Sequence, residues 1–454
     1  LQHYIVDADA RVAITSADLA DGMVQASDAL PAAQQLQHLL VTQHRDGFDP
    51  KSTPEGDMPE AWRDWLLSSH PVPVLTSGQT HHWVDALACA AELPAHTAQA
   101  ADMAVLPYTS GTTGLPKGCI HLHQSLMHNA MASAFWSQGT PDNVSLCVVP
   151  MFHITGMVSV MHSAIYLGAT LVLMPRWNRD LAARLIQRHR VTHWTNIPTM
   201  VIDLLGSPDV DQYDLSSLVH IGGGGAAMPQ AVAQRLNTQW GLKYIEGYGL
   251  TETSPVVSFN PLSGEPRLGS IGIPAPGTDV RLVSEAGQDV PVGEPGEIWV
   301  RGPQVMQGYW QNEAETAHVM HEGWFATGDI GVMDAEGFFR IVDRKKDMVL
   351  VSGFNVYPNE VEDVIAQMDA VLEVAVVGTP DDRTGEAVRA YVVPNPDHAG
   401  ALRTEDVLEH CKQHLAAYKR PSSVVLRDEL PKSPIGKVLR KDLKAEVKHE
   451  FNRA

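Results

Sequence analysis

The chain has 454 residues, which is too many for one compact core, so we expect two or more domains. Its formal net charge of −20 argues against a nucleic-acid partner and against tight binding to anionic lipid, because both need a basic surface. The four cysteines are scattered and include no Cys-x-x-Cys pair, which argues against a disulfide framework or zinc site and favours a cytoplasmic setting.

The first part of the chain, residues 1–103, alternates helical patterns with a turn-rich polar loop at 48–57. A short strand is expected at 105–108. Residues 121–137 then show the spacing of a helix.

Residues 143–175 contain no Asp, Glu, Lys or Arg, which raises the question of a membrane span. Two prolines and two glycines interrupt the segment, and two histidines lie inside it. We therefore interpret it as a strand, a helix and a strand buried in an α/β core, with the strands at 146–149 and 170–174.

Strands and helices continue to alternate after this segment. A helix is expected at 181–189, and strands are expected at 193–196 and 218–221, the second leading into the run Gly222–Gly225. Strands that alternate with helices predict parallel sheets.

The pattern changes beyond about residue 268, where short β runs separated by Gly and Pro predict a small β-barrel-like subdomain. These runs are 280–283, 296–301 and 338–343. A compact tail follows, with helices at 361–368 and 404–415 and strands at 371–377 and 387–393. The expected fold class is α/β. Parallel α/β subdomains and the β-barrel-like subdomain form a large N-terminal domain over 1–342, and a small α+β C-terminal domain covers 348–454, with the boundary at 343–347.

Residues 108–118 read Tyr-Thr-Ser-Gly-Thr-Thr-Gly-Leu-Pro-Lys-Gly. Glycines let the backbone approach a ligand, and successive free N–H groups in such a turn form an anion nest. Hydroxyl groups can donate to phosphate oxygens, and a lysine adds positive charge. The spacing differs from the Walker loop, in which a lysine directly follows the last glycine. The candidate phosphate-binding residues are Thr109, Ser110, Gly111, Thr112, Thr113, Gly114 and Lys117.

Four further strings follow in order along the chain. They are Gly-Tyr-Gly-Leu-Thr-Glu at 247–252, Thr-Gly-Asp at 327–329, Asp-Arg-Lys-Lys-Asp at 343–347 with Ser-Gly-Phe-Asn at 352–355, and Pro-Lys-Ser-Pro-Ile-Gly-Lys at 431–437. Together with residues 108–118, they resemble the motifs of the adenylate-forming enzymes, in the order of that superfamily. It includes acyl-CoA synthetases, aryl-CoA ligases, peptide-synthetase adenylation domains and beetle luciferase. The string at 352–360 is most similar to the bacterial fatty-acyl subfamily.

The resemblance implies a nucleotide and metal site. Glu252 would hold Mg²⁺, a cation that prefers carboxylate oxygens and keeps several waters, while Thr251 would contact the α-phosphate. Tyr248 would stack on adenine. Asp329 would accept hydrogen bonds from both ribose hydroxyls, and Arg344 would make a second ribose or phosphate contact.

The resemblance also implies a mobile C-terminal domain. Lys437 would be catalytic, with its ammonium bridging the attacking carboxylate and the α-phosphate. It lies far in sequence from the phosphate loop, so it could act only when the small domain closes over the site. Lys346, in the 343–347 hinge, would absorb the rotation between two closed states. Gly353 would line the pantetheine tunnel for CoA in the thioester-forming state.

Three features concern the acyl group. His153 resembles a family residue near the acyl pocket, although a lone histidine between apolar residues is more often a core residue. Gly222–Gly225 would form one pocket wall, where missing side chains leave room for an acyl chain, and Gly223 and Gly224 are the candidate binding residues of this run. Met157 stands where some long-chain enzymes carry a tryptophan, so the chain length stays open.

The implied function is that of an ATP-dependent acyl-CoA synthetase. ATP and a carboxylic acid, in particular a medium- or long-chain fatty acid, would give acyl-AMP, from which the acyl group passes to CoA. A ligase for aromatic acids, or one that serves a carrier protein, is the alternative within the family. An inactive nucleotide-binding fragment is the alternative outside enzymes. The chain opens at Leu1, so we expect a native N-terminal segment to be absent; a homodimer stays open.

Overall fold

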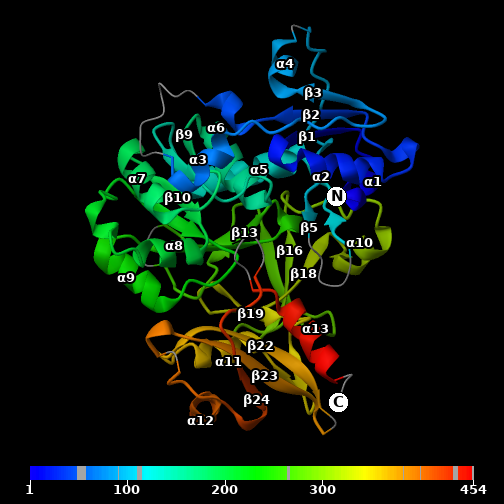
Figure 1. Cartoon of the computed structure of the whole chain (residues 1–454). Coiled ribbons are helices and arrows are strands. Elements are labelled where there is room, and N and C mark those ends of the chain that lie inside the picture. Colours follow the sequence, from blue (N-terminus) through cyan, green and yellow to red (C-terminus); the bar gives the residue numbers. More distant parts are fainter. Residues whose placement is uncertain are drawn as a thin grey trace.

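The computed structural model describes residues 1–48, 58–89, 91–109, 115–262, 266–381, 383–398, 400–432 and 438–451. Most of the polar loop expected at 48–57 lies outside these ranges. The described chain is a mixed α/β structure in which the last part, orange to red, forms a separate unit at one end (Figure 1). Across the described ranges, no helix is both long and apolar enough to cross a bilayer.

The N-terminal part contains a small parallel sheet that the sequence did not predict. Its order is β1-β2-β3, and its strands are β1 (Val12–Ser16), β2 (His38–Thr42) and β3 (Gln79–His82). The helices of this part are α1 (Gln2–Asp7), α2 (Ala17–Asp28), α3 (Glu60–Leu67) and α4 (Trp83–Ala88). Strand β3 reads Gln-Thr-His-His, which lacks the apolar alternation by which a strand is usually found.

A seven-stranded main sheet carries the centre of the molecule, in the order β14-β13-β12-β11-β10-β8-β9. Strands β8 to β12 run parallel, as the alternating pattern predicted, whereas β13 and β14 are antiparallel additions. The strands are β8 (Val144–Cys147), β9 (Thr170–Leu173), β10 (His193–Asn196), β11 (His220–Gly223), β12 (Tyr244–Gly249), β13 (Val256–Phe259) and β14 (Ile273–Pro274).

Helices cover both faces of this sheet. Leu146, Trp194 and Ile221 point to one face and form the largest core cluster with side chains of α7 (Arg179–His189), α8 (Pro198–Leu205) and α9 (Gln230–Trp240). The helical elements of the opposite face are α5 (His123–Trp136), a π-helical segment at Thr155–His162 and α6 (Ser163–Leu167). The uncharged segment 143–175 is thus strand, helix and strand, as predicted.

The β-rich part beyond residue 268 is a five-stranded antiparallel sheet, in the order β15-β16-β18-β17 with β19 paired to β18. Its strands are β15 (Asp279–Val283), β16 (Gly296–Arg301), β17 (Met320–His321), β18 (Trp324–Met333) and β19 (Phe339–Arg344), and α10 (Glu313–Val319) lies between β16 and β17. The three β runs predicted from the sequence are β15, β16 and β19.

The C-terminal unit has a second five-stranded sheet with its own apolar core. The predicted helices and strands correspond to α11 (Pro358–Ile365), α12 (Thr404–His414), β22 (Val371–Asp381) and β23 (Gly385–Pro394). The sequence analysis missed β20 (Val349–Val351), β21 (Phe354–Val356), β24 (Ser423–Leu426) and α13 (Arg440–Phe451). The α+β character of this unit is as expected.

Trp194 lies at the centre of the main core, fully buried and stacked on Trp177 with ring centroids 5.6 Å apart. We predict that Trp194→Ala lowers the free energy of unfolding by about 3 to 5 kcal/mol, because the cavity left behind is only partly refilled. Chemical denaturation measures this loss as the change in the free energy of unfolding of the domain that contains the main sheet. Val219→Ala, at a side chain that is 70% exposed, is the control and should change stability little.

Candidate active site

A cavity of about 3160 Å³ lies where the main sheet, the β-rich sheet and the C-terminal unit meet. Its walls include residues that follow the carboxyl ends of β8, β10, β11 and β12. Ligands of open α/β sheets bind at this edge, because the strand ends leave a crevice there. The cavity is therefore the candidate active site.

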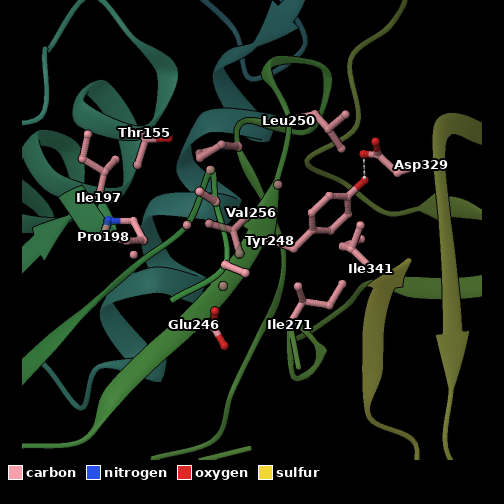
Figure 2. Close-up of a pocket in the computed structure, with 18 of the residues that line it drawn as sticks. Thr155, Ile197, Pro198, Glu246, Tyr248, Leu250, Val256, Ile271, Asp329 and Ile341 are labelled. Atoms are coloured by element: carbon pink, nitrogen blue, oxygen red, sulfur yellow. Dashed lines mark hydrogen bonds between the residues drawn. The ribbon is translucent and has the colours of Figure 1, made fainter. Parts of the chain in front are cut away.

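Tyr248 and Asp329 join two sheets across this cavity (Figure 2). The hydroxyl of Tyr248, on β12, donates to Asp329 Oδ2 on β18 at 2.5 Å. Asp329 is 5% exposed and lies directly opposite Arg344 in the β18–β19 pairing, with Arg344 Nε 3.3 Å from Asp329 Oδ1. Burial and the neighbouring carboxylate raise the pKa of Tyr248, so its hydroxyl stays a donor. Three residues that the sequence singled out from separate motifs thus form one cluster.

Thr251 and Glu252 lie in a short 3₁₀ turn, Thr251–Thr253, between β12 and β13. The Tyr309 hydroxyl donates to Glu252 Oε1 at 2.8 Å, and burial raises the pKa of this carboxyl group. Lys117 lies 4.4 Å from the centre of the Tyr309 ring, and its Nζ is paired with Glu315 Oε1 at 2.5 Å. Thr251, Glu252 and Lys117 line the same cavity.

His121 contacts the turn Thr251–Thr253 and the next residue, Ser254, through hydrogen bonds. Its Nε2 donates to the carbonyl of Thr251 at 2.7 Å, and its Nδ1 lies 2.8 Å from the Ser254 hydroxyl. Burial lowers the pKa of His121 to about 4, although the bond to the carbonyl acts in the opposite direction. A neutral imidazole in β7 (His121–Leu122) thereby fixes the backbone beside Glu252.

The glycine run at the end of β11 lines the cavity, but the neighbouring backbone is what requires glycine there. A Cβ on Gly223 would lie 1.8 Å from the Asn196 carbonyl oxygen, and one on Gly224 would lie 2.4 Å from that of Gly247. Strands β10 and β12 therefore exclude side chains at these positions whether or not a ligand is bound. This reason adds to the predicted role of the glycines as a pocket wall.

Part of the predicted site lies outside the described residues. This holds for Ser110, Gly111, Thr112, Thr113, Gly114 and the candidate catalytic Lys437. Thr109 in β5 (Tyr108–Thr109) pairs with Lys117 in β6 (Lys117–Gly118), and both line the cavity. Lys432, near the start of the motif that ends at Lys437, and Val438, directly after that motif, pair with each other and also line the cavity.

Of two other predicted residues, His153 lies at the cavity and Gly353 does not. His153 lines the cavity, and its Nδ1 accepts a hydrogen bond from the Thr155 N–H at 3.2 Å. Gly353, at φ +83°, is in the turn between β20 and β21 and is not among the residues that line this cavity. In this arrangement, the structure therefore does not bring Gly353 together with the nucleotide candidates.

The predicted hinge, 343–347, is tied to the last helix. Lys444 Nζ donates to the Lys346 carbonyl at 2.9 Å and to Asp347 Oδ1 at 2.8 Å. Arg440 donates to Glu362 at 2.6 Å and lies 3.7 Å from Asp343. Both basic residues belong to α13 and line the cavity.

Sequence reasoning missed Tyr309, Glu315 and His121. One signal was available for Glu315, because Asn312 followed three residues later by glutamate is typical of a helix start, and the Asn312 side chain does accept from the Glu315 N–H. That signal predicts the helix α10 and not the ion pair with Lys117. The other two residues belong to no motif that the sequence analysis used.

Two family models match the chain, one over its larger part and one over its C-terminal part. The family described as AMP-binding enzyme matches residues 1–310, and the one described as AMP-binding enzyme C-terminal domain matches residues 360–437. The chain belongs to the AMP-binding enzyme family. The resemblance read from the five motifs is thereby confirmed.

Individual AMP-binding enzymes give the same result. The chain is 45% identical over 350 residues to a long-chain-fatty-acid–CoA ligase of Yersinia pestis, and 42% identical over 345 residues to one of Bacillus subtilis. These alignments cover 76% and 75% of this chain. They cover 62% and 61% of the two relatives, so the chain spans less than two thirds of their length.

A solved AMP-binding enzyme shares the fold. The crystal structure of ATP-bound MatB from Rhodopseudomonas palustris superposes with a TM-score of 0.84 at 28% identity, covering 98% of this chain and 81% of that one. The predicted α/β fold, with a large N-terminal part and a small C-terminal part, is confirmed.

The buried His121 predicts how stability depends on pH. Between its ordinary pKa of 6.5 and the lowered value of about 4, the unfolded chain binds a proton that the folded chain excludes. Stability should therefore fall as the pH falls through this window, by up to about 1.4 kcal/mol per pH unit for one histidine. Urea denaturation across the window measures the slope.

His121→Asn should make that slope smaller. Part of the slope should remain, because His220 has a pKa lowered to about 4 by burial as well. His449→Asn, at an exposed side chain of α13, is the control. An unchanged slope in His121→Asn would contradict this account of the histidine.

Proposed function

We propose that the chain is an ATP-dependent acyl-CoA synthetase that acts on a medium- or long-chain fatty acid. The carboxylate attacks the α-phosphate of ATP, giving acyl-AMP and pyrophosphate, and the CoA thiolate then attacks the acyl carbon to give the thioester and AMP. The observation that carries the proposal is the convergence of Tyr248, Asp329 and Arg344 with Thr251 and Glu252 on one cavity. The similarity to long-chain-fatty-acid–CoA ligases supports the choice of acid and acceptor.

The described residues fit the nucleotide. Asp329 can accept from a ribose diol on the side not used by Tyr248, and Arg344 supplies a charge beside it. The Tyr248 ring, packed among Leu250, Ile271 and Ile341, offers a flat face to adenine (Figure 2). Phosphates would lie toward Thr109, Lys117 and Thr251, where hydroxyl and ammonium donors gather.

The same wall fits Mg²⁺. The side chain of Glu252 is partly buried, and the nearby ammonium of Lys117 is already paired with Glu315. A divalent cation would compensate the charge on Glu252, since Mg²⁺ takes one or two carboxylates and completes its shell with phosphates and water. When bound, it would neutralise charge that develops on the phosphates.

The test is pyrophosphate exchange into ATP with a series of carboxylic acids. Exchange that depends on a fatty acid supports the proposal, whereas no exchange with any acid would identify an inactive nucleotide-binding chain. Adding CoA or a phosphopantetheine carrier protein to preformed acyl-adenylate then identifies the acceptor. Better turnover of aromatic acids would favour the aromatic-acid ligase. We further propose a cytoplasmic location and leave a homodimer as a hypothesis for measurement of the solution mass.

Lys437 is proposed to serve the first half-reaction only. We predict that Lys437→Ala slows adenylate formation by about 10²-fold or more, the scale of losing one donor to the transition state. Thioester formation from synthetic acyl-adenylate should survive. Lys441→Ala is the matched control, and an equal loss of both half-reactions would contradict the separate roles.

Glu252 is proposed to hold the metal. Glu252→Gln keeps the shape and removes the charge, so the Mg²⁺ concentration for half-maximal exchange should rise by about tenfold or more. A titration of rate against Mg²⁺ measures it, with Glu313→Gln on the exposed first turn of α10 as the control. A lower rate with unchanged Mg²⁺ dependence would indicate a structural role instead.

A further inference from the structure

One face of the main sheet carries a polar row that the proposed reaction does not use. His193 on β10 is paired in register with Ser145 on β8 and with His220 on β11. Partners in register on parallel strands point to the same face, so the three side chains lie side by side across three strands. All three line the large cavity.

The opposite face at the next position is apolar. There Leu146, Trp194 and Ile221 are each fully buried in the main core. Strands buried on both faces usually read as continuous apolar runs. A row of one serine and two histidines on the cavity side therefore departs from what packing alone requires.

Helical segments close this part of the cavity from above. Residues of α5, the π-helical segment and α6 line it, including Ser133, Trp136, Ser159 and Leu167. Further along the same face of β11, Gly222 lines the same cavity as Tyr248. The polar row is thus the floor of a pocket whose mouth is the proposed nucleotide site.

The floor and the helical segments that cover it hold buried polar atoms that have no partner among the described residues. These are Nδ1 of His220, Oγ of Ser133 and Oγ of Ser159. His193 differs, because its ring nitrogens face Thr192 Oγ1 at 2.8 Å and Asn143 Nδ2 at 3.3 Å. Buried polar atoms are nearly always hydrogen-bonded, so each unpaired one calls for an explanation such as a bound group.

Charge limits what that group can be. Residues 120–175, which include β8 and all the covering helices, contain no Lys or Arg, and neither do 193–196 or 220–223. Burial lowers the pKa of His220 to about 4, with nearby His193 acting in the same direction, so the ring is neutral near pH 7. Within these ranges a second carboxylate would find no lysine or arginine, whereas a neutral hydroxyl can donate to one unpaired atom and accept from another.

The distance from the glycines to the floor of the pocket determines where along the acid the hydroxyl group must lie. From Gly223 to His220 the strand runs back three residues, which is about 10 Å at 3.3 Å per residue. A hydroxyl next to the carboxylate would stay near the glycines. One at the far end of a medium-length chain would reach the floor.

We propose that this pocket selects an acid whose distal end carries a hydroxyl group, held by His220 together with Ser133 and Ser159. The proposal rests on the proposed function and names the substrate class of the same site. An unsubstituted alkyl end would reach the floor without satisfying these polar atoms. The hydroxylated end would pair with them, and the difference appears in kcat/KM.

The experiment compares straight-chain fatty acids with the ω-hydroxy acid of each length, by pyrophosphate exchange. At the best length, the hydroxy acid should be preferred by about 10²-fold or more in kcat/KM. His220→Leu should reduce that preference by tenfold or more and raise activity on the unsubstituted acid. His220→Gln, which keeps a hydrogen-bonding side chain, should retain part of the preference.

The controls separate this inference from folding and from the proposed function. His189→Leu, an exposed histidine of α7, should leave the preference unchanged. If His220→Leu does not fold, Ser133→Ala and Ser159→Ala test the same pocket from the covering helices with smaller changes. Exchange with unsubstituted acids that equals or exceeds the hydroxy acids at every length would overturn the inference and leave the proposed function standing. No exchange with any acid would defeat the proposed function itself.

Discussion

The hydrogen bond from Tyr248 to Asp329 is the contact on which the candidate site depends. It joins a strand of the main sheet to a strand of the β-rich sheet, and the two strands come from motifs about eighty residues apart in sequence. Because Asp329 is also paired in register with Arg344, this bond holds the beginning of the predicted hinge beside the main sheet. Residues of both sheets line the cavity.

The charges around this bond are arranged in pairs. Lys117 faces Glu315, Arg344 faces Asp329, and Lys444 faces Asp347. Buried or half-buried pairs of this kind are costly to break by removing one partner, because the other charge is left without compensation. Under the proposed function, the triphosphate would therefore compete with carboxylates for Lys117 and Arg344. This competition would favour a highly charged ligand over a weaker anion.

The sequence predicted most of the framework and only part of the site. Segment 143–175 was predicted correctly because the absence of charge indicated burial and its glycines and prolines marked the breaks. The sequence did not predict strand β3, because its four residues are polar. It did not predict α13 either, because that helix begins just after the motif at 431–437, which indicates a catalytic lysine and not a helix. Motif strings identified Tyr248 and Asp329, but their bond, like that between Lys117 and Glu315, joins positions far apart in the chain. Such pairings depend on how sheets pack, which no local pattern encodes.

The attachment of α13 to the predicted hinge has a mechanical consequence. Lys444 binds the backbone carbonyl of Lys346, and a turn of the backbone at that residue swings the carbonyl through a large angle. Under the proposed hinge role, α13 would hold the small unit in one orientation. That orientation would change only when the bond from Lys444 to the Lys346 carbonyl and the ion pair with Asp347 open together. Switching would then be stepwise rather than gradual, as expected of an element with two discrete packings. Salt that screens the partly exposed ammonium of Lys444 would weaken its ion pair with Asp347 and shorten the time spent in each orientation.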